Sequence, residues 1–250
     1  MLVHYAWFGA GLAVMTAATV GIAWRAGVGL GTFPAWALLR ACVQLVVVAL
    51  LLRGILAVPV TVVAFVLLMA TTASWTAAHR LDALWRGRRS AVAGVLAGAS
   101  TSMLAIFGLG LVELEVRYVV AIGGIIVGNA MSAATLSGRN FLRGARARAP
   151  EIEAWLSLGA TPSHAHQAVG QEAVRESVLP TLDQTKSTGL VTLPGAFVGA
   201  LFGGASPAEA AQFQLVVLAG IALAMLVTAV TVTRLVGRSP YLTLSPLDSP

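Results

Sequence analysis

The sequence predicts an all-α, polytopic integral membrane protein with about seven transmembrane helices. Of its 250 residues, 58% are hydrophobic and only 10% are charged, and the mean hydropathy is +0.85. A soluble domain carries roughly 25% charged residues, so this chain must use lipid as part of its solvent. Apolar runs long enough to cross a bilayer recur along the chain, separated by short arginine-rich segments. We therefore expect a single transmembrane domain over residues 1–250.

Seven apolar stretches are candidates for spanning helices, since a helix needs about 20 apolar residues to cross the hydrocarbon core. They are residues 4–23, 37–57, 59–78, 91–112, 118–137, 183–203 and 212–235. The first five and the last are clearly apolar, whereas the sixth begins with polar residues. No basic residue precedes the first stretch, so we expect a membrane helix there and not a cleaved signal peptide.

The charges of the connecting segments predict the orientation of the chain. The segment after the third stretch carries four arginines and one aspartate, and residues 139–148 carry four arginines and no acid. Such basic loops face the cytoplasm, which puts the N-terminus outside and the C-terminus in the cytoplasm. The net charge of +6 does not indicate nucleic-acid binding, because most arginines lie in loops between apolar runs.

Residues 139–180 form the one sizeable cytoplasmic segment that the sequence predicts. After its basic run, Pro150 suits the first turn of a helix, and Glu151 and Glu153 suit the positive end of the helix dipole. Gly159 is a natural helix stop. The residues therefore predict a short amphipathic helix that ends near Gly159.

A second, longer cytoplasmic helix is expected after a tight Gly-Ala-Thr-Pro turn. Thr161 can cap it, Pro162 suits its first position, and Pro180 is expected to end it. His164 and His166 are two positions apart and point in different directions. We expect both imidazoles on a solvated helix surface and not in a metal site.

Two interpretations of these cytoplasmic helices stay open from the residues alone. In the first, both helices lie on the membrane surface or pack on the protein's own loops. In the second, the short helix and the turn are presented to a soluble partner. An exposed Trp155 beside small residues slightly favours this second interpretation, because aromatic residues often anchor interfaces.

The stretch EAWLSLGATP, residues 153–162, resembles the coupling loop of ABC-transporter permeases, in which Glu-Ala-Ala is followed by three residues and Gly. Glu153, Ala154 and Gly159 match this pattern, and Trp155 stands at the second Ala. The stretches LLRACVQLVVVALLLRGIL, GGIIVGNAMSAATL and LPTLDQTKSTGLVTLPGAFVGALFGGASPAEAAQFQ resemble, in this order, the permease family of the bacterial iron exporter FetB. Plant aluminium-tolerance half-transporters belong to the same family. The resemblance covers about residues 37–235.

The resemblance implies the permease subunit of an ABC transporter in the cytoplasmic (inner) membrane, exporting metal ions such as iron. Such a subunit is not an enzyme: ATP is carried by a separate cytoplasmic ABC ATPase, and no cofactor is bound directly. No G-x-x-x-x-G-K-[ST] loop occurs in the sequence, which agrees with this division of labour. A homodimer with two ATPase chains is expected. The alternative is a stand-alone secondary transporter or channel of unknown substrate.

The resemblance places the docking of the ATPase on the segment 139–180. The expected ATPase-coupling residues surround its turn: Glu151, Glu153, Ala154, Trp155, Leu158, Gly159, Ala160, Thr161 and Pro162. Closure of the ATPase pair would bias a two-state membrane domain, with the rigid turn transmitting the motion.

Polar residues within or beside the apolar runs are the candidates for the substrate pathway. Asp183 and Lys186 are three residues apart and can pair on one helical face. They either sit at the cytoplasmic interface, with Asp183 capping the sixth span, or line the inner mouth, where hard oxygens suit a metal cation. The complete set of candidates is Asn129, Met131, Asp183, Gln184, Thr185, Lys186 and Thr188.

Two further features complete the predicted pathway. Asn129 in an apolar run is either an interhelical hydrogen-bonding residue or a substrate contact. Gly189, Pro194 and Gly195 predict a break in the sixth span, a hinge whose freed carbonyl groups line a cavity. The sequence assigns no metal ligand.

Overall fold

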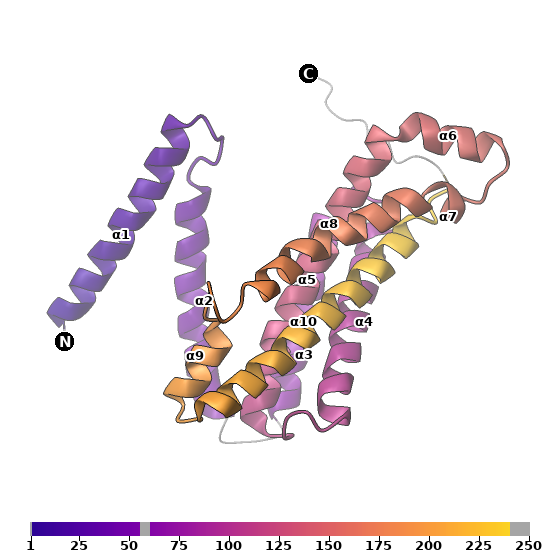
Figure 1. The fold of residues 1–250 in the computed structure, drawn as a ribbon. Helices are drawn as coiled ribbons and strands as arrows, with labels where there is room; N and C mark the ends of the chain where they lie inside the picture. The colour runs from indigo at the N-terminus through magenta and orange to yellow at the C-terminus, as the bar shows by residue number, and fades with distance from the viewer. Residues whose placement is uncertain (1, 56–60, 241–250) are drawn as a thin grey trace. The chain divides into compact units, whose positions relative to one another are not determined.

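The computed structural model describes residues 2–55 and 61–240, and every regular element within these ranges is an α-helix. The chain divides into two compact units, Met1–Pro59 and Val60–Pro250. The first unit contains α1 and α2, and the second contains α3 to α10 (Figure 1). Six helices in the described ranges are long and apolar enough to cross a membrane. The prediction of an all-α membrane protein is therefore confirmed.

The first unit is a pair of apolar helices joined by a short turn. α1 spans Leu2–Arg25, α2 spans Phe33–Ile55, and the two pack against each other. Most of their described side chains are exposed, as expected for helices whose surroundings are lipid. The predicted stretches 4–23 and 37–57 are confirmed as helical, except that residues 56 and 57 lie outside the described ranges.

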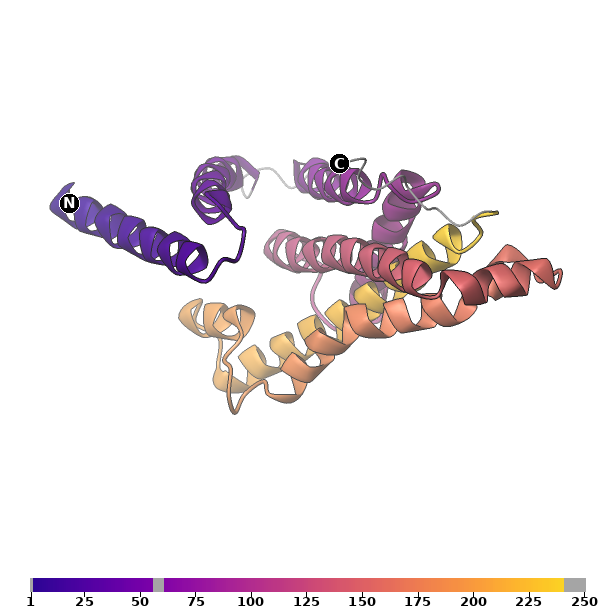
Figure 2. The same cartoon turned by 90° about the horizontal axis from the view of Figure 1, so that it is seen from above.

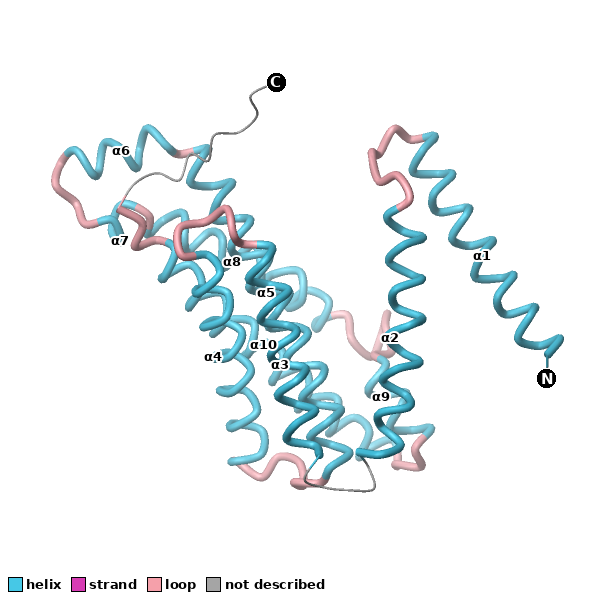
Figure 3. The backbone as a smooth tube through the Cα atoms, turned by 180° about the vertical axis from the view of Figure 1, so that it is seen from behind, coloured by secondary structure: helices cyan, strands magenta, loops and turns pink. Residues whose placement is uncertain are grey.

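Four long helices form the core of the second unit (Figures 2 and 3). They are α3 (Thr61–Arg80), α4 (Gly87–Gly108), α5 (Val116–Ala147) and α10 (Pro207–Val236). α10 packs along α4 and α5, and α3 packs on the same two helices. The four corresponding predicted spans are confirmed with shifted ends, except that residues 59 and 60 lie outside the described ranges.

Small residues allow α4 and α10 to approach closely. A Cβ atom added at Gly98 would lie 2.0 Å from the Thr228 hydroxyl oxygen. That hydroxyl donates to the Gly94 carbonyl oxygen at 3.0 Å, and the Ser102 hydroxyl donates to the Gly220 carbonyl oxygen at 2.8 Å. The close approach that Gly98 allows and the two interhelical hydrogen bonds together stabilise this pair of helices, as is usual between membrane helices.

One end of the second unit gathers most of its arginines. α3 ends there and α4 begins there, and α5 and α10 end there, beside α6 (Ala149–Ser157), α7 (Pro162–Ala165) and the start of α8 (Gln167–Lys186) (Figure 1). We call it the basic end. Its arginines are Arg80, Arg86, Arg88, Arg89, Arg139, Arg143, Arg146, Arg148, Arg234 and Arg238. The positive-inside rule predicts that the basic end faces the cytoplasm.

The prediction of a sixth spanning helix over residues 183–203 is wrong. α8 ends at Lys186, and α9 covers only Gly195–Phe202. Between them Gly189 adopts a φ of +91°, and its N–H donates to the Thr192 carbonyl oxygen at 2.8 Å. A left-handed glycine closes a tight loop at this point because it has no Cβ to clash.

The predicted break in this region is therefore present, although its role as a hinge stays a prediction. Pro194 precedes α9 in an extended conformation and is its N-cap residue. Gly195, which was also assigned to the hinge, is the first residue of α9. We call residues 187–194 the α8–α9 break.

The prediction that Pro180 ends the cytoplasmic helix is also wrong. Pro180 lies inside α8, which continues to Lys186. Proline removes one N–H from the helical ladder, but its fixed φ is compatible with a helix. Packing of α8 against α5 and α10 supplies the compensation. The helix expected from Pro162 onward is instead divided at His166 into α7 and α8.

Candidate functional site

An ion pair with two hydrogen bonds fixes the start of α6. Arg148 lies between α5 and α6, and its Nε and Nη2 donate to the two carboxylate oxygens of Glu151 at 2.7 and 2.9 Å. Hydrogen bonding by Arg148 holds the pKa of Glu151 below its ordinary value, and the same contact raises the pKa of Arg148. Arg148 Nη1 also lies 3.7 Å from Glu172 Oε2. One side chain thus connects α6 to α8.

The turn after α6 is closed by backbone hydrogen bonds that require Gly159. Gly159 has a φ of +86°, a conformation that side chains disfavour. Its N–H donates to the Leu156 carbonyl oxygen, and the Ala160 N–H donates to the Trp155 carbonyl oxygen, each at 3.0 Å. These two bonds form a Schellman motif, which satisfies the last carbonyl groups of the helix. The predicted helix stop at Gly159 is confirmed.

The α6–α7 hairpin, residues 149–165, carries apolar side chains outward at the basic end. Ile152 is buried, whereas Leu158 is 81% exposed and Trp155 is 43% exposed. The Trp155 ring meets the His164 ring in a T-shaped arrangement with centroids 5.2 Å apart. Thr161 caps α7 as predicted, because its Oγ1 accepts a hydrogen bond from the His164 N–H at 3.4 Å. The hairpin therefore brings the predicted coupling residues together.

The pair of Asp183 and Lys186 lies at the C-terminal end of α8, not at the start of a spanning helix. Lys186 Nζ is 2.9 Å from Asp183 Oδ1, and more than half of each side chain is exposed. The idea that Asp183 caps a sixth span is therefore wrong. Gln184 is also exposed, and the hydroxyl groups of Thr185 and Thr188 donate to carbonyl oxygens one turn earlier, at 2.8 and 3.2 Å.

A buried glutamine on α10 holds the start of α9, and the sequence reasoning did not identify it. Gln214 is 5% exposed, and its Oε1 accepts a hydrogen bond from the Phe197 N–H at 3.1 Å. N–H groups in the first turn of a helix lack partners within that helix, so this contact caps α9 from outside. The sequence does show an amide side chain inside the apolar run 212–235, which indicates that Gln214 has a hydrogen-bonding partner within the protein.

The remaining pathway candidates lie on α5. Asn129 donates through Nδ2 to the Ile125 carbonyl oxygen at 2.8 Å, so its amide bonds within its own helix. Met131 is half-buried and packs against the hydrophobic core. No hydrogen bond or ion pair in the described ranges joins either residue to Asp183. Within these ranges, no group of three or more His, Cys, Asp or Glu side chains is placed to hold a metal ion.

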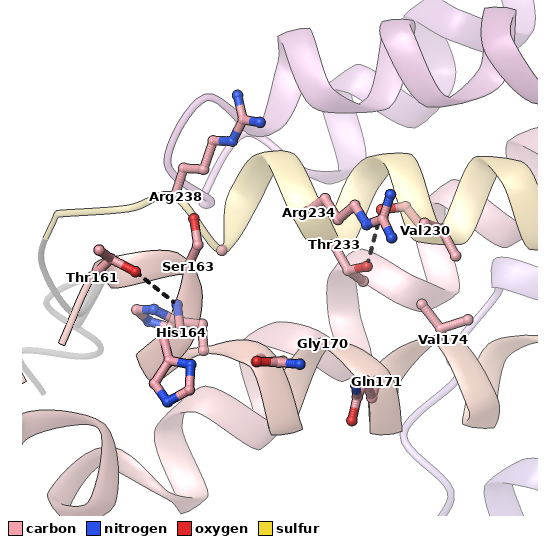
Figure 4. A pocket seen from close by; sticks show the side chains of 13 residues that line it. Thr161, Ser163, His164, Gly170, Gln171, Val174, Val230, Thr233, Arg234 and Arg238 are labelled. Atoms are coloured by element: carbon pink, nitrogen blue, oxygen red, sulfur yellow. Dashed lines mark hydrogen bonds between the residues drawn. The ribbon is translucent and has the colours of Figure 1, made fainter. Parts of the chain in front are cut away.

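A pocket of about 630 Å³ lies between the first turns of α7 and α8 and the last turns of α10 (Figure 4). Figure 4 shows Arg238 and Thr161 toward one end of this pocket and Val174 and Val230 toward the other. The residues that line it are Thr161, Ser163, His164, His166, Gln167, Gly170, Gln171, Val174, Val230, Thr233, Arg234, Gly237 and Arg238. We call it the α8–α10 pocket.

His166 in this pocket is buried, which contradicts the expectation of a solvated imidazole. Only 3% of the residue is exposed, and its ring stacks on Phe141 of α5 with centroids 5.7 Å apart. Its Nδ1 lies 2.9 Å from the Pro162 carbonyl oxygen and donates to it. The helix division at His166 turns this ring toward α5, whereas His164 is exposed as expected.

The chain is similar to membrane proteins of bacteria and plants. The family described as "Uncharacterised protein family (UPF0014)" matches residues 8–241. The "UPF0014 membrane protein STAR2" of Oryza sativa subsp. japonica is 32% identical over 82% of this chain and 72% of its own length. "Protein ALUMINUM SENSITIVE 3" of Arabidopsis thaliana is 36% identical over 68% of this chain and 62% of its own length.

A bacterial relative carries a transport description. The "Probable iron export permease protein FetB" of Escherichia coli (strain K12) is 32% identical over 73% of this chain and 71% of its own length. No solved structure matches the chain significantly. The family match covers nearly the whole chain and agrees with the six long apolar helices of the described ranges. The chain is therefore a multi-pass membrane protein that belongs to the UPF0014 family.

Proposed function

We propose that the chain is the membrane subunit of an ABC transporter that exports metal cations, iron foremost, driven by ATP on a separate ATPase subunit. The observation that carries this proposal is the α6–α7 hairpin. It projects at the basic end with Leu158 81% exposed and Trp155 beside it, on a turn that backbone hydrogen bonds make rigid. A partly exposed aromatic residue next to an exposed leucine is a typical anchor for a protein partner.

The contacts of the hairpin supply a route from the partner to the membrane helices. Arg148 joins α6 to Glu172 on α8, and α8 leads directly to the α8–α9 break. A push on α6 would therefore reach the break through one helix. A change of this kind moves cargo only if the partner binds the two states of the membrane subunit with different affinity.

The α8–α9 break is the segment that we assign to the cation path. Discontinuous helices in transporters expose backbone carbonyl oxygens where they line a cavity. The C-terminal end of a helix carries partial negative charge, and α8 adds the Asp183 carboxylate at that end. Hard oxygen ligands of this kind suit metal cations. The relative FetB is described as a probable iron export permease, which supports iron as the first cation to test.

The assembly that we propose contains two copies of this chain and two ATPase chains in the cytoplasmic (inner) membrane, with the basic end inward. ATP binds the partner, and this subunit binds no cofactor of its own. Nucleic acid plays no part in this assembly. A stand-alone secondary transporter or channel is the alternative, and it differs in needing no ATPase.

The test is ATP-dependent transport of Fe²⁺ by the chain and its ATPase co-reconstituted in proteoliposomes. Leu158→Ala is expected to weaken ATPase binding and to lower transport together. Leu114→Ala is the matched control, since Leu114 is 78% exposed but lies between α4 and α5, away from the basic end. Transport that proceeds at the same rate without ATP or ATPase would reject the ABC assignment and favour the alternative.

A further inference from the structure

The α8–α10 pocket has an unbalanced positive charge. Arg234 and Arg238 line it, and its lining contains no aspartate or glutamate. Neither arginine forms an ion pair with a carboxylate in the described ranges, in contrast to Arg88 and Arg148. Two guanidinium groups that line one pocket without a carboxylate partner favour an anionic ligand there.

The polar groups around these arginines suit a phosphate. A guanidinium group presents a planar fork of donors that matches two phosphate oxygens. Ser163, Gln167 and Gln171 add a hydroxyl and two amides to the same lining. These neutral side chains donate to an anion without cancelling the charge of the arginines.

The shape of the pocket indicates where such a phosphate comes from. Arg238 lies toward one end, and Val174 and Val230 lie toward the other, farther along α8 and α10 (Figure 4). α10 is itself a candidate membrane span, so its last turns lie where the hydrocarbon core gives way to headgroups. Figure 4 shows Arg234 beside Val230, so charged and apolar side chains adjoin along α10, and a pocket lined by both kinds of group fits an amphiphile.

We propose that the α8–α10 pocket binds an anionic phospholipid, with the headgroup phosphate held by Arg234 and Arg238 and the acyl chains beside Val174 and Val230. Basic pockets between membrane helices on the cytoplasmic side are a known setting for anionic lipid headgroups. The proposal uses only the membrane location of the chain and does not depend on ATP-driven metal export. Its consequence is that the region next to the α6–α7 hairpin is stabilised by lipid charge.

The test is the thermal unfolding midpoint of the full-length chain in detergent, titrated with phosphatidylglycerol, with phosphatidylcholine or with inorganic phosphate. Phosphatidylglycerol is expected to raise the midpoint in a saturable way, because a ligand that binds only the folded state stabilises it. The double variant Arg234→Gln/Arg238→Gln should bind it about thirtyfold more weakly, at about 1 kcal/mol for each arginine.

The matched control is Arg139→Gln/Arg143→Gln. These two arginines are also four positions apart and exposed at the basic end, but they do not line the pocket. The control should keep the response of the unchanged protein. A second variant, Arg234→Lys/Arg238→Lys, keeps the charge and should retain most of the binding, which separates loss of binding from loss of folding.

Three results would overturn the proposal. If the pocket and control variants lose phosphatidylglycerol binding equally, the binding depends on general surface charge and not on the pocket. Equal shifts with phosphatidylcholine would remove the need for an anionic headgroup. A shift with inorganic phosphate but none with phosphatidylglycerol would identify a free anion as the ligand instead of a lipid.

Discussion

Trp155 and His164 meet ring to ring across the turn between α6 and α7, with centroids 5.2 Å apart in a T-shaped arrangement. T-shaped aromatic contacts contribute about 0.5–1.5 kcal/mol beyond the area that they bury. The contact holds Trp155 in place while leaving 43% of it exposed at the basic end. Trp155 is therefore positioned in advance for a partner.

Trp155→Ala is expected to weaken binding of the ATPase about thirtyfold or more, because truncating an aromatic hot-spot residue costs about 2 kcal/mol or more. Trp155→Phe should retain most of the affinity. The measurement is a pull-down titration of ATPase on the purified chain. Trp75→Ala serves as control, since Trp75 is 73% exposed on α3. An equal loss in the control variant would contradict the assignment of Trp155.

Gly159→Ala is expected to destabilise the α6–α7 hairpin by about 1 kcal/mol, since a Cβ is strained in the left-handed region. The readout is hydrogen exchange at the Gly159 and Ala160 amides, which close the turn. Gly128→Ala is the comparison, because Gly128 lies within α5 with open space around its Cβ position. Unchanged exchange at the turn in Gly159→Ala would refute the prediction.

Asp183→Asn is expected to lower cation transport about tenfold or more, the loss that corresponds to about 1.4 kcal/mol in one charge-assisted contact. Folding should change little, because exposed ion pairs contribute about 0–1 kcal/mol. Lys186→Met tests whether the carboxylate or the pair is needed. Asp82→Asn is the matched control, because Asp82 pairs with Arg88 in another exposed contact. Full transport activity in Asp183→Asn would leave the pair with a structural role.

Gln214→Leu is expected to loosen α9 at a cost of about 1–3 kcal/mol, because it leaves the Phe197 N–H without its acceptor. Faster hydrogen exchange at Phe197 is the direct measurement, supported by a lower thermal unfolding midpoint. Gln212→Leu, at an exposed position on the same helix, should leave both unchanged. If both variants behave alike, Gln214 does not fix α9.

The pairing of Arg148 with Glu151 predicts a pH dependence. The pKa of Glu151 is lowered in the folded chain, so its contribution to stability is present above the unfolded pKa and is lost as pH falls through the folded pKa. The unchanged protein should therefore be more stable than Glu151→Gln at neutral pH, and this difference in stability should disappear as the pH falls below 4.5, the ordinary pKa of the carboxyl group. The comparison is made by thermal unfolding of both proteins from neutral to acidic pH. A constant difference across that range would contradict the prediction.

The elements that could be predicted from sequence are those that depend on local chemistry or on bilayer thickness. Six long helices follow from apolar length alone. The turn between α6 and α7 could also be predicted, because Gly159 adopts a left-handed conformation and Thr161 caps α7. The stretch 183–203 was counted as a span because of its mean apolarity, although Gly189, Pro194 and Gly195 within it predicted a break. Its two halves are short and are set by tertiary contacts.

Tertiary partners explain the rest of what was missed. Gln214 and Phe197 are far apart in sequence, and nothing local indicates that one caps the helix of the other. His166 was expected in solvent because it lies in a predicted cytoplasmic helix, yet its ring stacks on Phe141 of α5. The helix continues through Pro180, and α8 packs against α5 and α10 through buried residues that precede this proline.

The close contact of α4 with α10 has a mechanical consequence. With Gly98 pressed against Thr228 and two interhelical hydrogen bonds across the seam, these helices cannot slide past each other without losing both bonds. The two helices therefore form a rigid frame within the second unit. If a partner that binds at the basic end causes a conformational change, the segments that move must be those not held rigidly by this frame. The α8–α9 break, whose residues belong to no helix, is the part best suited to move.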